Sequence, residues 1–276
     1  RHRHVASLAE HVHLDDMVGV APRIETRRAR DCPACWDLSA PEKATQVVAR
    51  PRMDEAPSPE ACMAHAVASL QHSDLMSEIP TSDTFQALMT RYAPGYRRSR
   101  SDTFPLTDPT LTASQLVSQA AQADHWRRIV SMTKEYILTS VPHTEAPPAS
   151  DVDTLLAWWH LRLVSLWKLH FFSNLQEEMQ ALWQVLESVR VYEGDDLRVL
   201  VDTPHVSFPM HVLRAQVLLQ NDRRRGVQLL WKHMQRAKEA SADSVWRARY
   251  VRVALLLSSL LVEMDALPAA TSLVDE

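Results

Sequence analysis

The chain has 276 residues, a formal net charge of -4 and a pI of about 6.4. This balance lacks the strongly basic footprint of proteins that bind a phosphate backbone, so nucleic acid is not an expected partner. Four glycines against sixteen prolines leave little material for glycine-rich phosphate loops or hairpin turns, and favour helices. Three cysteines, an odd number without a regular array, form no disulfide framework and are typical of a reducing compartment.

The sequence contains no segment that we expect to cross a membrane. Its most apolar stretch, residues 253–262, has about half of the ~20 residues that a bilayer-spanning helix needs, and Arg249 and Arg252 precede or flank it. This stretch therefore predicts a buried helix. Residues 1–4 alternate arginine and histidine and do not begin the apolar run of a secretory signal, so we expect a cytoplasmic protein.

Residues 1–110 are predicted to be a largely disordered or loosely helical N-terminal region. Proline, arginine, serine and aspartate alternate there, and apolar residues keep no helical period for long. Two short helices are expected within it, at residues 4–18 and 58–70, and the second has a Ser58 cap with Pro59 in its first turn. Residues 91–109 carry several arginines and prolines and predict a linker, which places a domain boundary near residue 110.

Residues 111–276 predict paired helices. Thr112 caps the first helix, a break at residues 124–125 follows, and apolar residues then share one face from Trp126 to residue 138. A second pair begins at Asp151 or Asp153, breaks near residues 172–174 and returns over residues 175–189. Residues 192–205 are expected to be a polar insertion that ends at a proline. The third pair is expected at residues 208–219 and 223–240, and the fourth runs from residue 245 or 246 to 262 and starts back at Pro268.

The predicted fold is an all-α, tetratricopeptide-like solenoid of irregular helical hairpins. The turns near residues 124, 173, 221 and 265 recur at intervals longer than the usual ~34 residues of that repeat. Each hairpin has an apolar face that it cannot bury alone, and stacking on its neighbours covers it. Because the last return helix has only begun at Glu276, we expect the repeat array to be truncated at its C-terminal end.

Three segments of the predicted solenoid carry a family resemblance. They are residues 159–163 (WHLRL) with 167–171 (WKLHF), residues 204–215 (PHVSFPMHVLRA) and residues 246–253 (WRARYVRV). In this order they resemble the twelfth subunit of the transport protein particle (TRAPP) membrane-tethering complex. The resemblance covers roughly residues 126–265, and residues 1–111 show none.

The resemblance implies a non-catalytic scaffold subunit of a TRAPP complex. Such a subunit acts in vesicle tethering between endoplasmic reticulum and Golgi and in autophagy, and it binds other large subunits of the complex. The expected location is cytoplasmic, peripheral to endoplasmic reticulum and Golgi membranes through the complex. No cofactor is expected. An adaptor of the tetratricopeptide class is an alternative, although the ordered lysine, asparagine and arginine residues of a carboxylate clamp are not found.

A zinc site is the alternative from another class of protein. Cys32 and Cys35 are separated by two residues, and so are Cys62 and His65, which is a frequent way to present four tetrahedral ligands. Unreactive thiols in a loosely structured segment are the competing interpretation. Other histidines stand singly, without a nucleophile elbow or a zinc-binding helix, and predict no catalytic site: His160, His170, His205, His211 and His233.

The candidate partner-binding residues are Arg223, Arg224, Arg225 and Trp231. The three arginines open a helix that also carries Lys232, His233, Arg236 and Lys238. This basic face has three interpretations: a solvated surface, a docking site for an acidic partner segment, or a contact with anionic lipid. Six tryptophans at helical spacing are expected to be mostly core, although one or two could bind a partner: Trp158, Trp159, Trp167, Trp183, Trp231 and Trp246.

Overall fold

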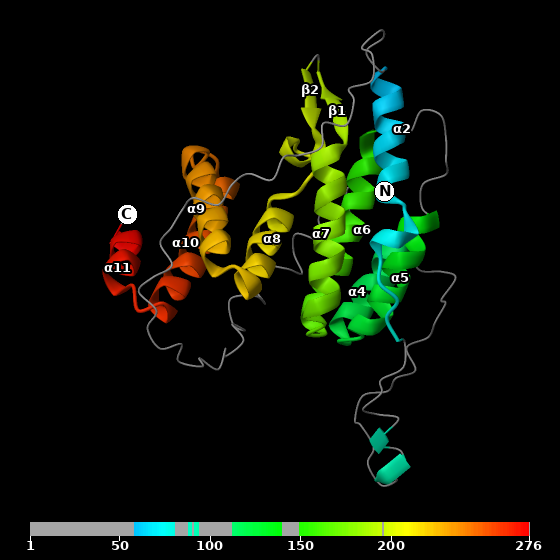
Figure 1. Cartoon of the computed structure of the whole chain (residues 1–276), viewed down its shortest axis with the longest axis horizontal. Helices are drawn as coiled ribbons and strands as arrows, with labels where there is room; N and C mark the ends of the chain where they lie inside the picture. The colour runs from blue at the N-terminus through cyan, green and yellow to red at the C-terminus, as the bar shows by residue number, and fades with distance from the viewer. Residues whose placement is uncertain are drawn as a thin grey trace, which may run out of the picture.

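The computed structural model describes residues 58–80, 88–89, 91–93, 112–139, 149–194 and 196–275 (Figure 1). The helix expected at residues 4–18, the cysteines at 32 and 35 and most of the linker at 91–109 lie outside these ranges. The predicted all-α class is confirmed. The elements are α2 (Pro59–Leu70), η1 (Ser73–Leu75), α4 (Ala113–Gln122), α5 (Trp126–Thr139), α6 (Ala149–Lys168), α7 (Phe172–Ser188), β1 (Arg190–Glu193), β2 (Asp196–Val199), η2 (Leu200–Asp202), α8 (Phe208–Asn221), α9 (Arg223–Glu239), α10 (Ser244–Glu263) and α11 (Leu267–Asp275).

Helix starts follow the capping residues of the sequence. The Thr112 hydroxyl accepts a hydrogen bond from the backbone N–H of Gln115 at 3.4 Å, and the Gln115 amide oxygen accepts from the N–H of Thr112 at 2.9 Å. This reciprocal pair is a capping box, which satisfies two N–H groups at the start of α4. Ser58 accepts from the N–H of Ala61 at 3.2 Å, and Pro59 occupies the first turn of α2. Both predicted caps are therefore confirmed.

Three of the turns between paired helices share one backbone conformation without using glycine. Asp124, His170 and Asp265 have φ angles of 56°, 59° and 57°, in the left-handed region. In each turn the next residue donates to a carbonyl five positions earlier, which is the Schellman closure of a helix end. Asp and His enter this region more readily than most side chains. The donor and acceptor pairs are His125 with Ala120 (2.8 Å), Phe171 with Leu166 (3.0 Å) and Ala266 with Leu261 (2.9 Å).

The second turn lies earlier than the sequence predicts. The expected break at residues 172–174 belongs to the first turn of α7, which begins at Phe172. The chain reverses instead at residues 169–171, where His170 takes the positive φ angle. Serine and asparagine favour helix starts as well as turns, so residues 173–174 indicated a helix end where a helix begins.

Part of the expected polar insertion at residues 192–205 forms a β-hairpin, which the sequence pattern does not predict. Strands β1 and β2 pair antiparallel, with Val191 opposite Arg198 and Glu193 opposite Asp196. Gly194 supplies the positive φ angle of 65° that the tight turn requires. Val191 is fully buried, and β1 contacts α2, so the hairpin covers one end of the helical group (Figure 1).

Helix α2 belongs to the main core rather than to a separate N-terminal region. Ala66 and Leu70 are fully buried within the same hydrophobic cluster as α5, α6 and α7. The indole Nε1 of Trp159 donates to the carbonyl of Leu70 at 2.9 Å, and the Gln71 amide donates to the carbonyl of Ile137 at 3.0 Å. The boundary expected near residue 110 therefore does not separate α2 from the helical domain.

A buried ion pair joins four segments of this core. The side chains of Arg162 on α6 and Glu178 on α7 are each 1% exposed. They form a two-pronged contact, with both nitrogen to oxygen distances at 2.7 Å. Arg162 also donates to the carbonyls of Val130 on α5 and Ser77 after η1. Two further N–H donors of the guanidinium thus have backbone acceptors, which helps to offset the cost of burying the charge.

Helix α8 separates two hydrophobic clusters. Met210, Leu213 and Val217 face the cluster built by α2 and α4 to α7. Phe208 and Val212, on the opposite side of α8, face a second cluster built with α9, α10 and α11. Figure 1 shows the corresponding two groups of helices, with α8 between them. None of the described helices is long and apolar enough to span a bilayer.

Candidate interaction surface and pocket

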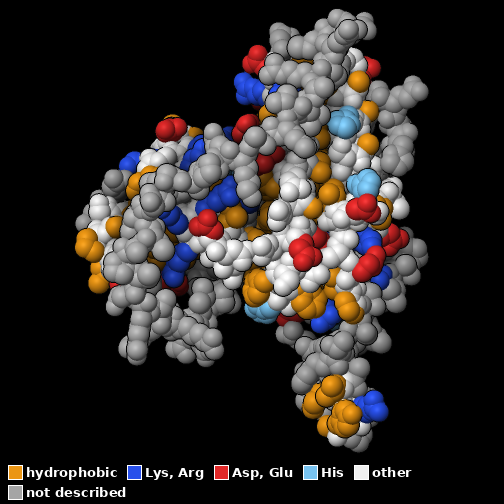
Figure 2. Space-filling view, viewed as in Figure 1, with side chains coloured by type: hydrophobic (Ala, Val, Ile, Leu, Met, Phe, Trp, Pro, Cys, Tyr) orange, Lys and Arg blue, Asp and Glu red, His pale blue; other side chains and the backbone are white. Residues whose placement is uncertain are grey.

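Helix α9 has one buried and one exposed side. Leu230 and Met234 are fully buried against α8 and α10. Arg224 and Trp231 are two turns apart outside this buried stripe, where both side chains are exposed, the indole to 45%. Figure 2 shows Lys and Arg side chains gathered over α8, α9 and α10. The other exposed basic residues of α9 are Arg225, Lys232, Arg236 and Lys238.

The three arginines predicted as a cluster do not all face solvent. The guanidinium of Arg223 donates to a carboxylate oxygen of Glu263 on α10 at 3.3 Å. Arg224 and Arg225 are exposed, and the backbone N–H of Arg225 is capped by the carboxylate of Asp222 at 2.9 Å. The acidic cap offsets the unfavourable placement of cations at a helix N-terminus. Two of the three arginines therefore remain on the exposed face with Trp231.

The six tryptophans occupy three environments. Trp158, Trp159 and Trp183 are buried, as expected for core residues, whereas Trp167 and Trp246 are half-buried. Trp231 is the exposed member of the six, so it is not one of the core tryptophans. Its position on the helix lies at the edge of the stripe that Leu230 and Met234 define, so the indole reaches solvent. Similarly His233, expected on the basic face, is buried at 7% exposure.

Helix α10 exposes a row of aliphatic side chains. Val251, Leu255 and Val262 recur at helical spacing and are 48%, 50% and 50% exposed. Leu267 at the start of α11 is 57% exposed. Figure 2 shows hydrophobic side chains at the outer edge of the α10 and α11 region. Contiguous exposed aliphatic groups of this kind are characteristic of surfaces that contact another molecule.

The proposed zinc ligands that the structure describes do not converge. Cys62 on α2 is 7% exposed and faces the core, whereas His65, one turn later, is exposed to solvent. Among the described residues, no group of three or more histidine, cysteine, aspartate or glutamate side chains could hold a metal ion. Cys32 and Cys35 lie outside the described ranges, so the four-ligand set as a whole is not tested.

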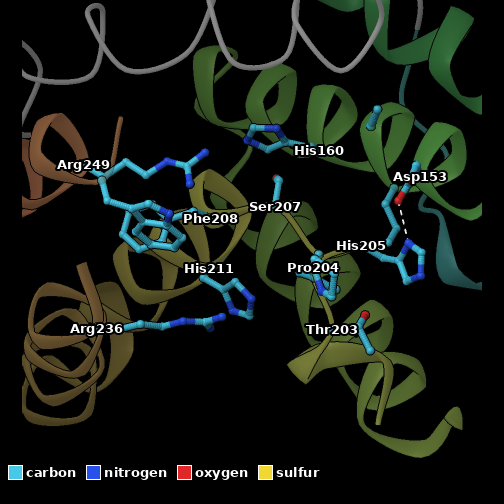
Figure 3. Close-up of a pocket in the computed structure, with 14 residues that line it drawn as sticks. Asp153, His160, Thr203, Pro204, His205, Ser207, Phe208, His211, Arg236 and Arg249 are labelled. Atoms are coloured by element: carbon cyan, nitrogen blue, oxygen red, sulfur yellow. Dashed lines mark hydrogen bonds and ion pairs between the residues drawn. The ribbon is translucent and has the colours of Figure 1, made fainter. Parts of the chain in front are cut away.

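A pocket of about 370 Å³ lies between α6 and the group formed by α8, α9 and α10 (Figure 3). Arg236 and Arg249 approach it from one side, and Asp153 and His205 from the other. The imidazole Nδ1 of His205 lies 2.7 Å from a carboxylate oxygen of Asp153. All three segments of the family resemblance contribute to the lining, through His160, residues 204–208 and 211, and residues 246 and 249.

Aromatic rings form one wall of this pocket and hold an arginine. Phe208 and Trp246 meet edge to face, with ring centroids 5.4 Å apart. The Arg249 guanidinium carbon lies 4.7 Å from the Trp246 ring centroid and 5.5 Å from that of Phe208. These are cation–π distances, so the rings restrain the orientation of the guanidinium at the pocket.

Two neutral histidines lie at the pocket, and one of them, His211, lines it. The rings of His211 and His233 are 5.2 Å apart. Burial is the largest cause that lowers the pKa of His211 to about 3, and His233, Arg236, Arg214 and Lys232 act in the same direction. Burial likewise lowers the pKa of His233 to about 4, with Lys232 and Arg236 acting in the same direction. Both imidazoles therefore lie in a buried site with cationic neighbours, and neither is an imidazolium at neutral pH.

Sequence reasoning did not find this pocket. Its residues come from positions as far apart as 153 and 249, at no spacing that marks a binding motif. A helical period does not show which helices will pack together, so the sequence does not indicate that several of its histidines lie close to one another. The only signal was indirect, since each of the three segments that carry the family resemblance contributes lining residues.

The fold and these sites define a helical-hairpin protein with an exposed basic and aliphatic face and a basic pocket. A scan against protein-family models and searches of curated proteins and solved structures give no match to this chain. Its function therefore has to be argued from the geometry above and from the resemblance in the sequence.

Proposed function

We propose that this protein is a non-catalytic scaffold that binds another protein through the exposed sides of α9, α10 and α11. The observation that carries the proposal is the 45% exposure of Trp231 on α9, a helix that also exposes Arg224 and Arg225. Tryptophan and arginine are the residues most enriched among those that dominate binding energy at protein interfaces. The half-exposed aliphatic row of α10, with Val251 and Leu255, adds apolar area that a partner would cover.

The assembly that we propose is a TRAPP-type tethering complex. The support is the ordered resemblance of residues 159–171, 204–215 and 246–253 to the twelfth TRAPP subunit. These segments belong to α6, to the start of α8 and to the start of α10, and all three border the same pocket. On this proposal the protein is cytoplasmic and peripheral to endoplasmic reticulum and Golgi membranes, and its partners are other large subunits of the complex.

Affinity purification of the tagged full chain, with identification of the co-purifying proteins, tests the assignment. We expect TRAPP subunits in the wild-type eluate, and a loss of at least ~10-fold in their yield for the Trp231→Ala variant, the size expected of an interface hot spot. Arg224→Glu with Arg225→Glu should act in the same direction.

Arg190→Glu is the matched control, because Arg190 is an exposed arginine on β1, away from α9. Its yield of partners should equal that of wild type. Absence of TRAPP subunits from the wild-type eluate under gentle conditions would contradict the assembly, and normal yields from the α9 variants would contradict the surface.

A further inference from the structure

The pocket between α6 and α8 to α10 has an excess of positive charge. Arg236 and Arg249 both line it, and the one carboxylate among its lining residues, that of Asp153, is engaged by His205. The Arg236 side chain forms no hydrogen bond or ion pair with any residue that the structure describes. Because Arg249 lies against Phe208 and Trp246, these rings restrain the orientation of its planar guanidinium at the pocket.

The start of α8 adds to this potential. Ser207 is its N-terminal cap, and Ser207 and Phe208 both line the pocket. The Ser207 side chain makes no capping hydrogen bond, so the positive end of the helix dipole is not offset by a local acceptor. Burial, followed by the nearby cationic side chains, lowers the pKa values of His211 and His233 and keeps both imidazoles neutral. The guanidinium groups and the helix terminus therefore both favour an anionic ligand.

The basic residues of α9 extend beyond the pocket in a line. Arg225, Lys232 and Arg236 recur at spacings of seven and four residues, which places them in one row along the helix. The row is about 16 Å long at the 1.5 Å rise of a helix, a length that about five extended residues span. A small anion would use only the pocket end of this row. A peptide with several carboxylates matches all of it.

From this arrangement we propose that the pocket binds a carboxylate side chain of an acidic peptide segment, which lies along the Arg225, Lys232 and Arg236 row of α9. Arg236 and Arg249 grip the inserted carboxylate, and the Phe208 and Trp246 wall contacts the adjoining aliphatic groups of the peptide. The inference rests on the proposed scaffold function, because it names the chemistry of the partner that the scaffold receives.

Fluorescence anisotropy with a labelled hexaglutamate peptide and the full chain tests this inference. Wild type should bind the probe, and binding should weaken as salt rises. Arg236→Glu should lower the affinity at least ~10-fold, because the contact between the guanidinium and the inserted carboxylate is lost and replaced by repulsion. Arg236 is exposed, so this variant is expected to fold, and its thermal unfolding can be compared with that of wild type. Arg249→Gln should weaken binding in the same direction.

Arg247→Glu is the matched control for charge. Arg247 is exposed on α10 and lies two residues from Arg249, hence on the other side of the helix. Its affinity for hexaglutamate should stay within about two-fold of wild type. Equal losses in Arg236→Glu and Arg247→Glu would overturn the inference, because they would indicate attraction to net charge alone.

Two further probes separate a peptide site from a small-anion site. Hexaglutamine should not bind, and diglutamate should bind at least ~10-fold more weakly than hexaglutamate if the α9 row is used. Equal affinities of diglutamate and hexaglutamate, with displacement of both by millimolar inorganic phosphate, would overturn the peptide and indicate a site for small anions.

Failure of this inference can be distinguished from failure of the scaffold assignment. If hexaglutamate binds wild type and Arg236→Glu equally while partners still co-purify, the pocket inference is wrong and the scaffold function stands. If hexaglutamate binds through Arg236 and no protein co-purifies, the peptide-binding chemistry is supported and the proposed assembly is wrong.

Discussion

The buried ion pair of Arg162 and Glu178 tests how charge is tolerated in the main core. Because each side chain is 1% exposed, Glu178→Gln leaves a guanidinium without its counter-charge and should lower the free energy of unfolding by about 3 to 5 kcal/mol. Urea unfolding of wild type and variant measures the difference. The double variant Arg162→Met with Glu178→Leu should lose less than Glu178→Gln alone, since no unpaired charge remains.

The exposed pair of Arg198 and Glu193 on the β-hairpin is the control. Both side chains are well exposed, so Arg198→Gln should change the free energy of unfolding by less than about 1 kcal/mol. A loss of the same size at Arg198 and at Glu178 would contradict the argument that burial sets the cost.

The two neutral histidines predict a stability that falls in mild acid. In the folded chain the pKa of His211 is lowered to about 3 and that of His233 to about 4, whereas an unfolded histidine titrates near 6.5. Between these values the unfolded state binds more protons, so their stabilisation is fully present above about pH 6.5 and is lost as pH falls toward 4. From pH 7 to pH 5 we expect a loss of about 2 kcal/mol for each histidine.

Urea midpoints at pH 7 and pH 5 measure this loss, and His211→Phe should reduce it by roughly half. An unchanged pH dependence in that variant would show that other groups titrate instead.

At this scale the sequence indicates which residue types matter but not where each side chain points. Trp231 and the arginines of α9 were recognised as a candidate surface, yet only the structure turns Arg223 toward Glu263 and buries His233. The helical period places residues on a helix to within a few tens of degrees. It does not say which neighbour covers that angle, which is why the pocket at Arg236 and Arg249 was missed.

At the scale of elements, the non-glycine residues with positive φ angles at helix ends carry backbone strain that glycine would not. Asp265 has a φ angle of 57° and an exposed side chain between α10 and α11. In the left-handed region the Cβ atom lies too close to the backbone, and Asp265→Gly removes this strain. The free energy of unfolding should rise by about 0.5 to 1 kcal/mol, and the extra backbone entropy of glycine in the unfolded chain reduces this gain. Thermal unfolding measures the change. Asp265→Ala keeps the conflict, so an equal gain from alanine would contradict the explanation.

Gly226 on α9 is needed for a close approach to α8. A Cβ at this position would lie 2.7 Å from side-chain carbons of Leu219 and 2.9 Å from its backbone nitrogen. Alanine is the better helix former by about 1 kcal/mol, but the contact with backbone cannot be relieved by a rotamer change. Gly226→Ala should therefore lower the free energy of unfolding by about 1 to 3 kcal/mol in urea unfolding. A variant more stable than wild type would show that α8 and α9 can move apart enough to admit the methyl group without loss of stability.

Helix boundaries were predictable where a cap or a break stands in the sequence. Thr112 with Gln115, and Ser58 with Pro59, identified their helix starts correctly. The β-hairpin was not predictable, because a single glycine at residue 194 was the only turn signal in a chain rich in helical periods. Side-chain chemistry close in sequence sets caps, whereas pairing of β1 with β2 depends on burial of Val191 against α2, far earlier in the chain.

For the whole molecule, the contacts between segments distant in the sequence are the hardest feature to predict. Trp159 donates to Leu70, 89 residues earlier, and Gln71 donates to Ile137, 66 residues later. No periodicity reveals such contacts, so the sequence assigned α2 to a loosely structured region. The number and order of the hairpins after residue 112 follow from local patterns alone, and they agree with the structure.

The division of the core at α8 predicts two units that open separately. Leu213 is fully buried in the cluster with α7, and Val212 is 2% exposed in the cluster with α9 and α10. Truncating either side chain to alanine removes apolar contacts from one cluster only, at a cost of about 1 to 4 kcal/mol. Because local opening follows contiguous packed units, amide hydrogen exchange should accelerate in α5 to α7 for Leu213→Ala and in α9 to α10 for Val212→Ala. Uniform acceleration across all helices in both variants would instead mean that α8 couples the clusters into one cooperative unit, and that the basic pocket between them opens only when the whole chain unfolds.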